Sequence, residues 1–284
     1  METSGSATHR LVLGRDLKEL REKAGITREQ VAAHLSWYVA KISKIEQGQA
    51  TLKANDITAL LTFYGADPEE VQRIQETGAL ARKRGSFGKV ADWARQYLGL
   101  EGDAVALNVY DTELIHGLFQ TPEYAQAVVS TSAVVAAVDI PRVVESRMRR
   151  QVLLERQSPP EIHLILGEAA LRREIGGAAV LAAQIRRLVT VADLAHVTVQ
   201  ILPFAAGQHA ALGSGFTLLT VPVGTSNKSW AYLEDLTRAD LLDGDSHVNA
   251  YGLAFRTLTE TALSARESIS LMDSIALDLE RSKP

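Results

Sequence analysis

The sequence predicts an all-helical N-terminal region, a five-helix bundle, followed by an α+β domain. Residues 27–48 (TREQVAAHLSWYVAKISKIEQG) hold two short helical patterns joined by a tight turn. Beyond residue 100 the pattern changes, because alternating apolar residues typical of strands separate the helical segments. Strands and helices mix there without a regular βαβ repeat, which indicates an α+β arrangement.

A capping box begins the first helix of the 27–48 pair. Thr27 is a good N-cap residue, and Gln30 follows three residues later. Val31 and Leu35 then lie one turn apart on a single face. Trp37 is apolar where the turn would meet the core.

The second helix of the pair covers about residues 38–47. It buries Ile42 and Ile45 and ends at Gly48, a residue typical of helix C-termini. Two helices joined by so short a turn must cross steeply. A buried helical hairpin with a polar outer face is what a reader of the DNA major groove needs.

This stretch resembles the xenobiotic-response-element class of helix-turn-helix regulators, which includes phage repressors. The resemblance is carried by Val31, Leu35, Trp37, Ile42, Ile45, Glu46 and Gly48. Ser36 departs from the family, which usually has glycine there because the turn favours a left-handed backbone. A residue other than glycine in that conformation costs roughly 1 kcal/mol. The alternative reading is a purely structural helical hairpin.

Three more helices are predicted to complete the bundle. Residues 13–24 are amphipathic and end at Gly25, and residues 54–64 end at Gly65. The last helix opens at residues 67–70 (DPEE), which supply a cap, a first-turn proline and two acids.

Length and composition set the domain organisation. With 284 residues and no cysteine, the chain is long enough for two domains and excludes disulfides and thiolate metal sites. We predict a flexible tail over residues 1–8, a DNA-binding domain over 9–85, a linker over 86–99 and an α+β regulatory domain over 100–284. No long apolar run or signal peptide is present, so we expect a soluble, cytoplasmic protein that does not bind membranes.

The net charge of −4 is divided unevenly along the chain. Residues 9–85 hold 13 Lys and Arg against 10 Asp and Glu, a balance of +3. Residues 86–284 hold 17 against 23, a balance of −6. The positive field therefore lies where double-stranded DNA would bind, and its modest size favours a homodimer that contributes two such surfaces.

The second helix of the hairpin is expected to face the base edges through its first residues. Lys41 and Lys44 share a face and can reach guanine edges or phosphates, whereas Val39 and Ala40 could contact thymine methyls. The start of the first helix and the loop after the second are expected to contact phosphates. The predicted DNA-binding residues are Thr27, Arg28, Tyr38, Val39, Ala40, Lys41, Lys44, Gln49 and Thr51.

The second half alternates between strand and helix patterns. Strands are predicted within 101–118 and over 162–166, 197–201, 216–221 and 230–234, and helices after Pro122 and over 140–156, 180–191, 247–258 and 265–279. The last helix carries an apolar stripe (Ile269, Met272, Ile275, Ala276 and Leu279) that would be core or a dimer seam. A two-fold dimer would suit a roughly palindromic DNA site.

This half resembles the C-terminal domain of the WhiJ-like actinobacterial regulators. The matching segments are GLFQTPEYA (117–125), ESRMRRQVLL (145–154), LGEAALRREIGG (166–177), VTVQILPFAAG (197–207), GSGFTLL (213–219) and YLEDLT (232–237). The resemblance implies a transcriptional regulator, often encoded beside a very small acidic partner protein, with an antitoxin-like relationship proposed for some pairs.

Motifs for catalysis or metal binding are missing. The histidines never pair at ligand spacing, and GSG at 213–215 lacks the form of a nucleophile elbow or phosphate loop, so we expect no enzyme, no catalytic residue, no metal and no cofactor. Arg147, Arg149, Arg150 and Glu168 are candidate contacts for a small-molecule ligand or an acidic partner. The alternative reading is that these four residues form ion pairs inside the domain.

Three readings of function follow. The favoured one is a sequence-specific DNA-binding transcriptional regulator whose second domain dimerises and receives a protein or small-molecule signal. The second is an antitoxin-like module that sequesters a small acidic partner and autoregulates its own promoter. The third, an enzyme with a DNA-binding front end, would need a deep pocket with converging polar groups.

Overall fold

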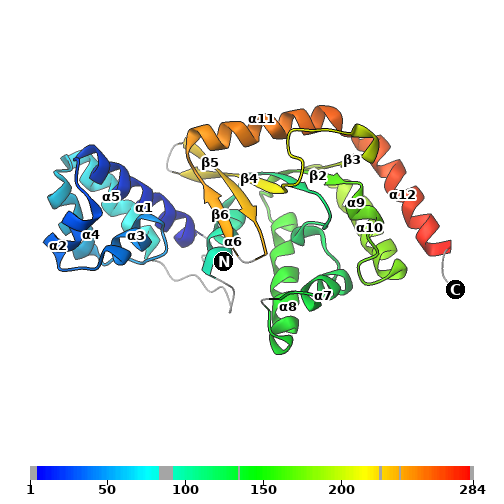
Figure 1. Ribbon diagram of the computed structural model, residues 1–284, viewed down its shortest axis with the longest axis horizontal. Helices are drawn as coiled ribbons and strands as arrows, with labels where there is room; N and C mark the ends of the chain where they lie inside the picture. The colour runs from blue at the N-terminus through cyan, green and yellow to red at the C-terminus, as the bar shows by residue number, and fades with distance from the viewer. Residues whose placement is uncertain (1–4, 83–91, 134, 224–225, 237, 282–284) are drawn as a thin grey trace. The chain divides into compact units, whose positions relative to one another are not determined.

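The computed structural model describes residues 5–82, 92–133, 135–223, 226–236 and 238–281, with the side chains of 92–95 left aside. The chain divides between Asp103 and Ala104 into two compact units. The first is all-helical, and the second holds a six-stranded mixed sheet with helices (Figure 1). Both fold classes predicted from the sequence are confirmed. Among the described helices, none is long and apolar enough to cross a membrane.

In its described residues, the first unit contains the five predicted helices and one more. They are α1 (Gly5–Lys23), α2 (Arg28–Leu35), α3 (Val39–Glu46), α4 (Ala54–Tyr64), α5 (Pro68–Ala81) and α6 (Asp92–Asp103). Their shared core is aliphatic and includes Leu17, Val31, Ile42, Leu60 and Ile74, each at most 1% exposed. The helical spacing of these residues is what directs each helix to one core.

The start of the chain differs from the prediction. Helix α1 begins at Gly5, so residues 5–8 form its first turns and do not belong to a tail. Ser6 and Thr8 are buried, and the Thr8 hydroxyl donates to Asp103 Oδ2 of α6 at 2.6 Å. Polar residues before Leu13 concealed this start, because their burial depends on α6, which is distant in sequence. Residues 83–91, which include part of the predicted linker, lie outside the described residues.

The sheet of the second unit has the order β3-β2-β1-β4-β5-β6. Its strands are β1 (Ala106–Asp111), β2 (Glu161–Gly167), β3 (Val197–Leu202), β4 (Phe216–Val223), β5 (Ser226–Glu234) and β6 (Ala239–Leu242). Strands β1, β2 and β3 pair in parallel, whereas β4, β5 and β6 add to β1 as an antiparallel meander.

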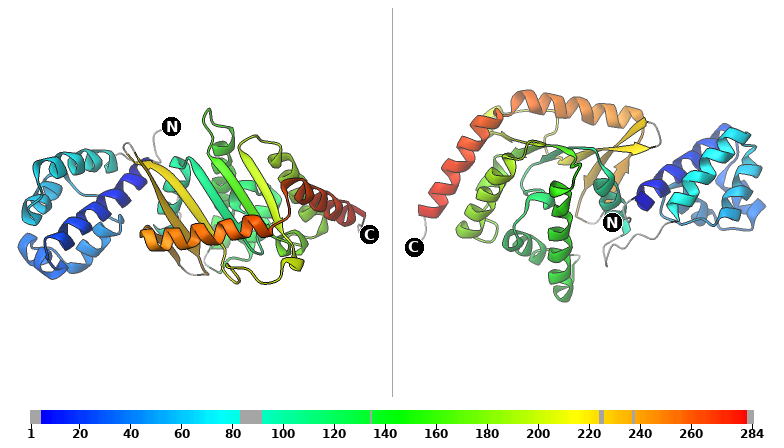
Figure 2. Two further views of the ribbon diagram at one scale, coloured as in Figure 1. Left: turned by 90° about the horizontal axis from the view of Figure 1, so that it is seen from above. Right: turned by 180° about the vertical axis from the view of Figure 1, so that it is seen from behind.

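Helices cover both faces of this sheet. They are α7 (Pro122–Ser130), α8 (Ile140–Arg150), α9 (Ala169–Arg172), α10 (Ala178–Ala192), α11 (Asp245–Thr261) and α12 (Ala265–Arg281). Helix α11 lies across one face, and α7 to α10 lie on the other (Figures 1 and 2). Under α11, Phe255 and Leu258 pack on Tyr110, Phe216 and Leu218.

Three details of the second unit were not predicted. The short strand β6 was missed, and the predicted helix 140–156 ends at Arg150, where a 3-10 turn follows. The parallel pairing of β1, β2 and β3 was also missed. Strands of parallel sheets are buried on both faces, and β2 is such a strand, because Ile165 is as buried as Leu164 and Leu166.

The apolar stripe of α12 belongs to the core of the unit. Met272, Ile275 and Ala276 are buried, and α12 packs along α10. Arg186 of α10 reinforces this contact through ion pairs with Asp273 at 2.6 Å and Glu280 at 3.0 Å. Core packing therefore accounts for the middle of the stripe, while Ile269 and Leu279 at its two ends are only half-buried, and a role of the stripe in dimerisation stays a prediction.

Candidate DNA-binding surface

The turn between α2 and α3 keeps the left-handed backbone of the helix-turn-helix class although Ser36 replaces the usual glycine. Ser36 has φ 55° and ψ 42°, and among the described residues it is the only non-glycine with positive φ. The Trp37 amide donates to the Ala32 carbonyl at 2.8 Å, which closes the end of α2. Trp37 itself packs against the helical core. The turn is therefore short and well fixed despite the missing glycine.

The start of α2 is fixed by the predicted capping box. The Gln30 amide donates to Thr27 Oγ1 at 3.3 Å, and the Thr27 amide donates to Gln30 Oε1 at 2.8 Å. The two side chains satisfy amide groups that no helical carbonyl can reach. The first turn of α2 is exposed at Glu29 and half-exposed at Arg28.

Helix α3 buries one side and exposes its first turn. Ile42 and Ile45 are in the core, whereas Tyr38 is 84% exposed and Val39 is 40% exposed. Ala40 is exposed as well. Tyr38, Val39 and Ala40 are therefore open to solvent at the start of α3.

The two lysines of α3 have different surroundings. Lys44 is exposed. Lys41 is half-buried, and its Nζ lies over the Trp37 ring. In the loop after α3, Gln49 and Thr51 are exposed, as predicted phosphate contacts would need to be.

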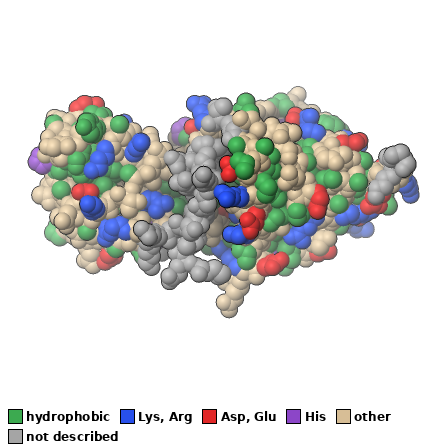
Figure 3. All heavy atoms as spheres, turned by 90° about the horizontal axis from the view of Figure 1, so that it is seen from below, with side chains coloured by type: hydrophobic (Ala, Val, Ile, Leu, Met, Phe, Trp, Pro, Cys, Tyr) green, Lys and Arg blue, Asp and Glu red, His purple; other side chains and the backbone are tan. Residues whose placement is uncertain are grey.

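Figure 3 shows one side of the protein, on which Lys and Arg side chains are spread over the first unit with few acidic ones among them.

A buried ion triad, which the sequence reasoning missed, joins α1, α2 and α3. Glu46 at the end of α3 accepts from Arg21 Nε at 2.5 Å and from Arg28 Nε at 2.7 Å. The Glu46 side chain is 2% exposed, that of Arg21 9% and that of Arg28 39%. Hydrogen bonding to Glu46 raises the pKa of Arg21. Arg28 thus has a structural partner inside the unit while part of its guanidinium faces solvent.

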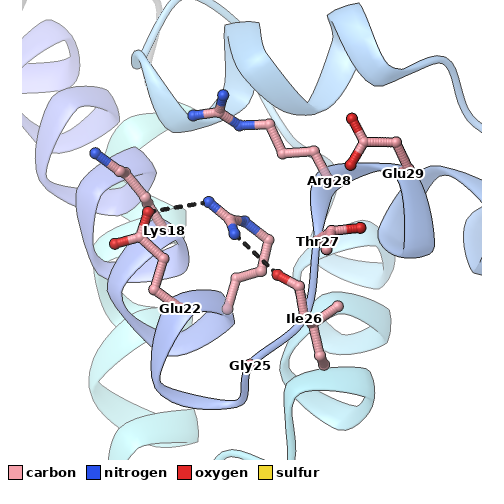
Figure 4. Close-up of a pocket in the computed structure, with 8 residues that line it drawn as sticks. Lys18, Glu22, Gly25, Ile26, Thr27, Arg28 and Glu29 are labelled. Atoms are coloured by element: carbon pink, nitrogen blue, oxygen red, sulfur yellow. Dashed lines mark hydrogen bonds and ion pairs between the residues drawn. The ribbon is translucent and has the colours of Figure 1, made fainter.

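A shallow open pocket adjoins this triad, with a volume of about 500 Å³. It lies where α1 turns into α2, and Lys18, Glu22, Thr27, Arg28 and Glu29 line it (Figure 4). Arg21 also lines the pocket and donates to the Ile26 carbonyl at 2.9 Å. Basic and acidic side chains mix around this pocket, so it does not form a uniformly positive cradle.

Backbone contact also fixes α3 against α1. A Cβ atom on Gly14 would overlap the carbonyl oxygens of Ile45 and Glu46. A Cβ atom on Gly48 would lie 2.8 Å from the Cα of Leu11. Gly48 also has φ 67°, which a side chain would strain. Glycine at both positions lets the end of α3 touch the backbone of α1.

Comparison with known families agrees with this division of the chain. A helix-turn-helix domain model matches residues 12–74, and a model described as a domain of unknown function, DUF5753, matches residues 94–274. The second match covers more than half of the chain. The chain belongs to the DUF5753 family. No curated protein and no solved structure matches it significantly. The helix-turn-helix domain indicates DNA binding, whereas the DUF5753 description assigns no role to the second domain.

The candidate contacts of the DUF5753 domain are engaged within it. Arg147 donates to Gln120 Oε1 at 2.9 Å, and burial lowers the pKa of this arginine. Arg149 pairs with Glu145 at 2.5 Å on the surface of α8. Glu168 pairs with Arg172 at 2.6 Å and accepts from the Phe204 amide at 2.9 Å.

Arg150 extends this basic group. It follows Arg147 by one helical turn, and its positive charge also lowers the pKa of Arg147. Its guanidinium lies beside Gly117, at the turn before α7. The ion pairs of Arg149 and Glu168 match the alternative reading of contacts inside the domain, and Arg147 is hydrogen-bonded within it; a role of these residues in binding stays a prediction. Among the described residues, no three His, Cys, Asp or Glu side chains come together as a metal site.

Proposed function

We propose that the protein is a sequence-specific transcriptional regulator of the xenobiotic-response-element type, whose helix α3 enters the major groove of DNA. The observation that carries the proposal is the exposed start of α3: the N-cap residue Tyr38 is 84% exposed and Val39, the first helical residue, is 40% exposed, whereas the other side of the helix is buried. In helix-turn-helix proteins this turn is the part that meets base edges. Access to the chromosome would place the protein in the cytoplasm.

The exposed residues divide by chemistry into two groups. Val39 and Ala40 are suited to thymine methyls, and Lys41 and Lys44 to guanine edges or phosphates. The remaining proposed contacts, to phosphates and sugars, are Thr27, Arg28, Tyr38, Gln49 and Thr51. Of the nine proposed contacts in the two groups, Arg28 and Lys41 are half-exposed and the other seven are exposed, which supports the assignment.

The regulator is proposed to act as a homodimer on a roughly palindromic operator. The first domain has a charge balance of only +3, which is small for a DNA-binding surface acting alone. Two copies of α3 about 34 Å apart would meet successive turns of the major groove. Light scattering coupled to size-exclusion chromatography would give the mass, and a strict monomer on and off DNA would contradict this part.

The first experiment is titration of the full chain against DNA from its own promoter region, at about 50 and about 200 mM salt. We expect saturable binding that outcompetes random DNA and weakens steeply with salt, because lysine–phosphate contacts release counterions. Equal, weak binding to all sequences would overturn sequence-specific recognition by the protein alone.

A matched pair of variants tests the placement of α3. Lys44→Ala removes an exposed positive charge from α3, and Lys23→Ala removes one from the end of α1, where Lys23 is 72% exposed and pairs with Glu70. We expect Lys44→Ala to weaken operator binding by about tenfold and to reduce the salt slope by about one. Lys23→Ala should change both much less. Equal effects of the two variants would mean that α3 is not the reading helix.

A further inference from the structure

The second domain contains a groove between α11 and the sheet that is separate from the arginines of α8. Its volume is about 430 Å³, and residues of β1, β4, β5 and α11 line it. Helix α11 lies across the strands of this face (Figure 2). Sites for small molecules commonly have volumes of about 300–1,000 Å³. The groove is therefore large enough for a small organic ligand.

The floor of the groove is polar at the sheet. Asn108 of β1 lies beside Leu218 of β4 in the strand register, and Thr220 lies beside Ser229. The Thr220 and Ser229 hydroxyls hydrogen-bond to each other at 3.0 Å, which leaves each with further hydrogen-bonding capacity. The half-buried Asn108 carboxamide has no hydrogen-bond partner among the described residues. An unpaired amide on a strand that faces a covering helix is available to a ligand.

The wall of the groove is one strip of α11. Val248, Gly252 and Arg256 follow each other at one-turn intervals, and all three line the groove. A Cβ atom on Gly252 would meet nothing within 4 Å, so the missing side chain leaves open space in the middle of the strip. Leu253, beside it, is 59% exposed and supplies an apolar rim.

Arg256 gives the groove a positive end. Its side chain is exposed and has no ion-pair or hydrogen-bond partner in the part of the chain that the structure describes. None of the described residues that line the groove is acidic. The surrounding residues 86–284 carry an acidic balance of 17 Lys and Arg against 23 Asp and Glu. An unpaired arginine in an acidic domain, beside an open groove, favours an anionic ligand.

We propose that this groove binds a small amphipathic carboxylate. The carboxylate pairs with Arg256, an amide or hydroxyl function hydrogen-bonds Asn108 and the Thr220 hydroxyl, and a short aliphatic group packs on Leu218 and Val248. The inference rests on the proposed function only in treating the second domain as the receiver of a signal. The binding itself does not require DNA.

N-acetyl-L-leucine is a suitable probe, because it combines a carboxylate, an amide and a branched aliphatic group. Saturation-transfer NMR with the full chain and no DNA would measure its binding. We expect transfer to its methyl groups with a Kd near about 1 mM, and at least about fivefold weaker binding of the neutral N-acetyl-L-leucinamide.

Three variants localise the site. Arg256→Gln should weaken binding at least about fivefold and remove the preference for the acid over the amide. Gly252→Leu fills the open space and should abolish binding, while a better helix former at that position keeps the domain folded. Arg266→Gln, an exposed arginine on α12, is the matched control and should bind as the wild type does.

Absence of saturation transfer at about 10 mM probe would overturn the proposal, since even a millimolar site would then be mostly occupied. Unchanged binding in both Arg256→Gln and Gly252→Leu would overturn it as well. Thermal unfolding of each variant shows whether it is folded. These outcomes are independent of the DNA titration, so failure of the ligand site and failure of DNA recognition are distinguishable.

Discussion

The Lys41 ammonium lies 3.3 Å from the centroid of the Trp37 ring. This contact joins the turn of the helix-turn-helix to a side chain proposed to reach the DNA. A cation over an indole ring is stabilised by about 0.5–1 kcal/mol at exposed sites. A contact between Lys41 and DNA would therefore have to break this stack. Lys44 is exposed, so it can contact DNA without leaving an aromatic ring.

A double-mutant cycle would measure the Trp37–Lys41 contact. Trp37→Leu keeps an apolar residue against the core, and Lys41→Met keeps the length of the side chain without its charge. We expect a coupling free energy of unfolding of about 0.5–1 kcal/mol between the two changes. Additive effects in urea denaturation would mean that the stack is not populated in solution.

Removal of Glu46 should destabilise the first domain strongly. Glu46→Ala leaves the Arg21 guanidinium, with a side chain only 9% exposed, without its main partner. We expect a loss of about 3 kcal/mol in the free energy of unfolding, measured by chemical denaturation. Glu22→Ala is the control, because Glu22 pairs with the same arginine at 3.3 Å but is 55% exposed. It should cost under about 1 kcal/mol. Equal losses would contradict a structural role for the buried triad.

Ser36→Gly should stabilise the protein. The left-handed backbone at Ser36 costs a non-glycine residue about 1 kcal/mol, which glycine avoids. We expect a gain of about 0.5–1 kcal/mol and a higher Tm by calorimetry. Gly65→Ala is the reverse test, because Gly65 has φ 70° with open space around it, and should lose a similar amount. A loss of stability in Ser36→Gly would show that the serine side chain contributes more than its backbone costs.

Asp111 should make stability depend on pH. Burial and the nearby charge of Glu234 raise the pKa of Asp111, at the end of β1, to about 7. Because the folded pKa lies above the unfolded value of about 4, the folded state binds this proton more tightly. The stability that the protonated Asp111 contributes is fully present below about pH 4 and is lost as the pH rises through about 7.

Asp111→Asn removes this titration. We expect the variant to be roughly 1–3 kcal/mol more stable than wild type at pH 8 and to show little gain at pH 4, measured by urea denaturation. Asp193→Asn, which changes an exposed aspartate after α10, is the matched control for the loss of one carboxylate. A wild-type profile that is flat between pH 4 and 8 would contradict the raised pKa.

The predictable parts of the first domain are those whose signals are local. The Thr27–Gln30 capping box and the left-handed turn at Ser36 each depend on a few consecutive residues, and the structure shows both. The triad was not predictable, because Arg21 and Glu46 are 25 residues apart and charged residues carry no periodic signal. The proposed base contacts depended on the position of α3, which the spacing of Ile42 and Ile45 indicated, and the proposed phosphate contacts on the start of α2 and the loop after α3.

The second domain was harder to predict, because its decisive contacts are not local. Strand β6 spans only Ala239–Leu242, too short for alternation to be seen. The groove under α11 depends on Asn108 and Arg256, which the fold brings together from distant parts of the chain. The role of Gly252 could not be predicted from the sequence, because the space beside a glycine becomes visible only when the elements packed around its helix are known.

The close backbone contact of Gly14 and Gly48 has a consequence for how DNA recognition can change. Because the end of α3 touches the backbone of α1, α3 cannot tilt or slide without separating the two helices. With α3 in the major groove as proposed, substitutions at Tyr38, Val39 or Ala40 should alter which bases are preferred while the approach angle to the duplex stays the same. New operator preferences should be obtainable by exchanging these side chains alone, with α1 as an unchanged frame.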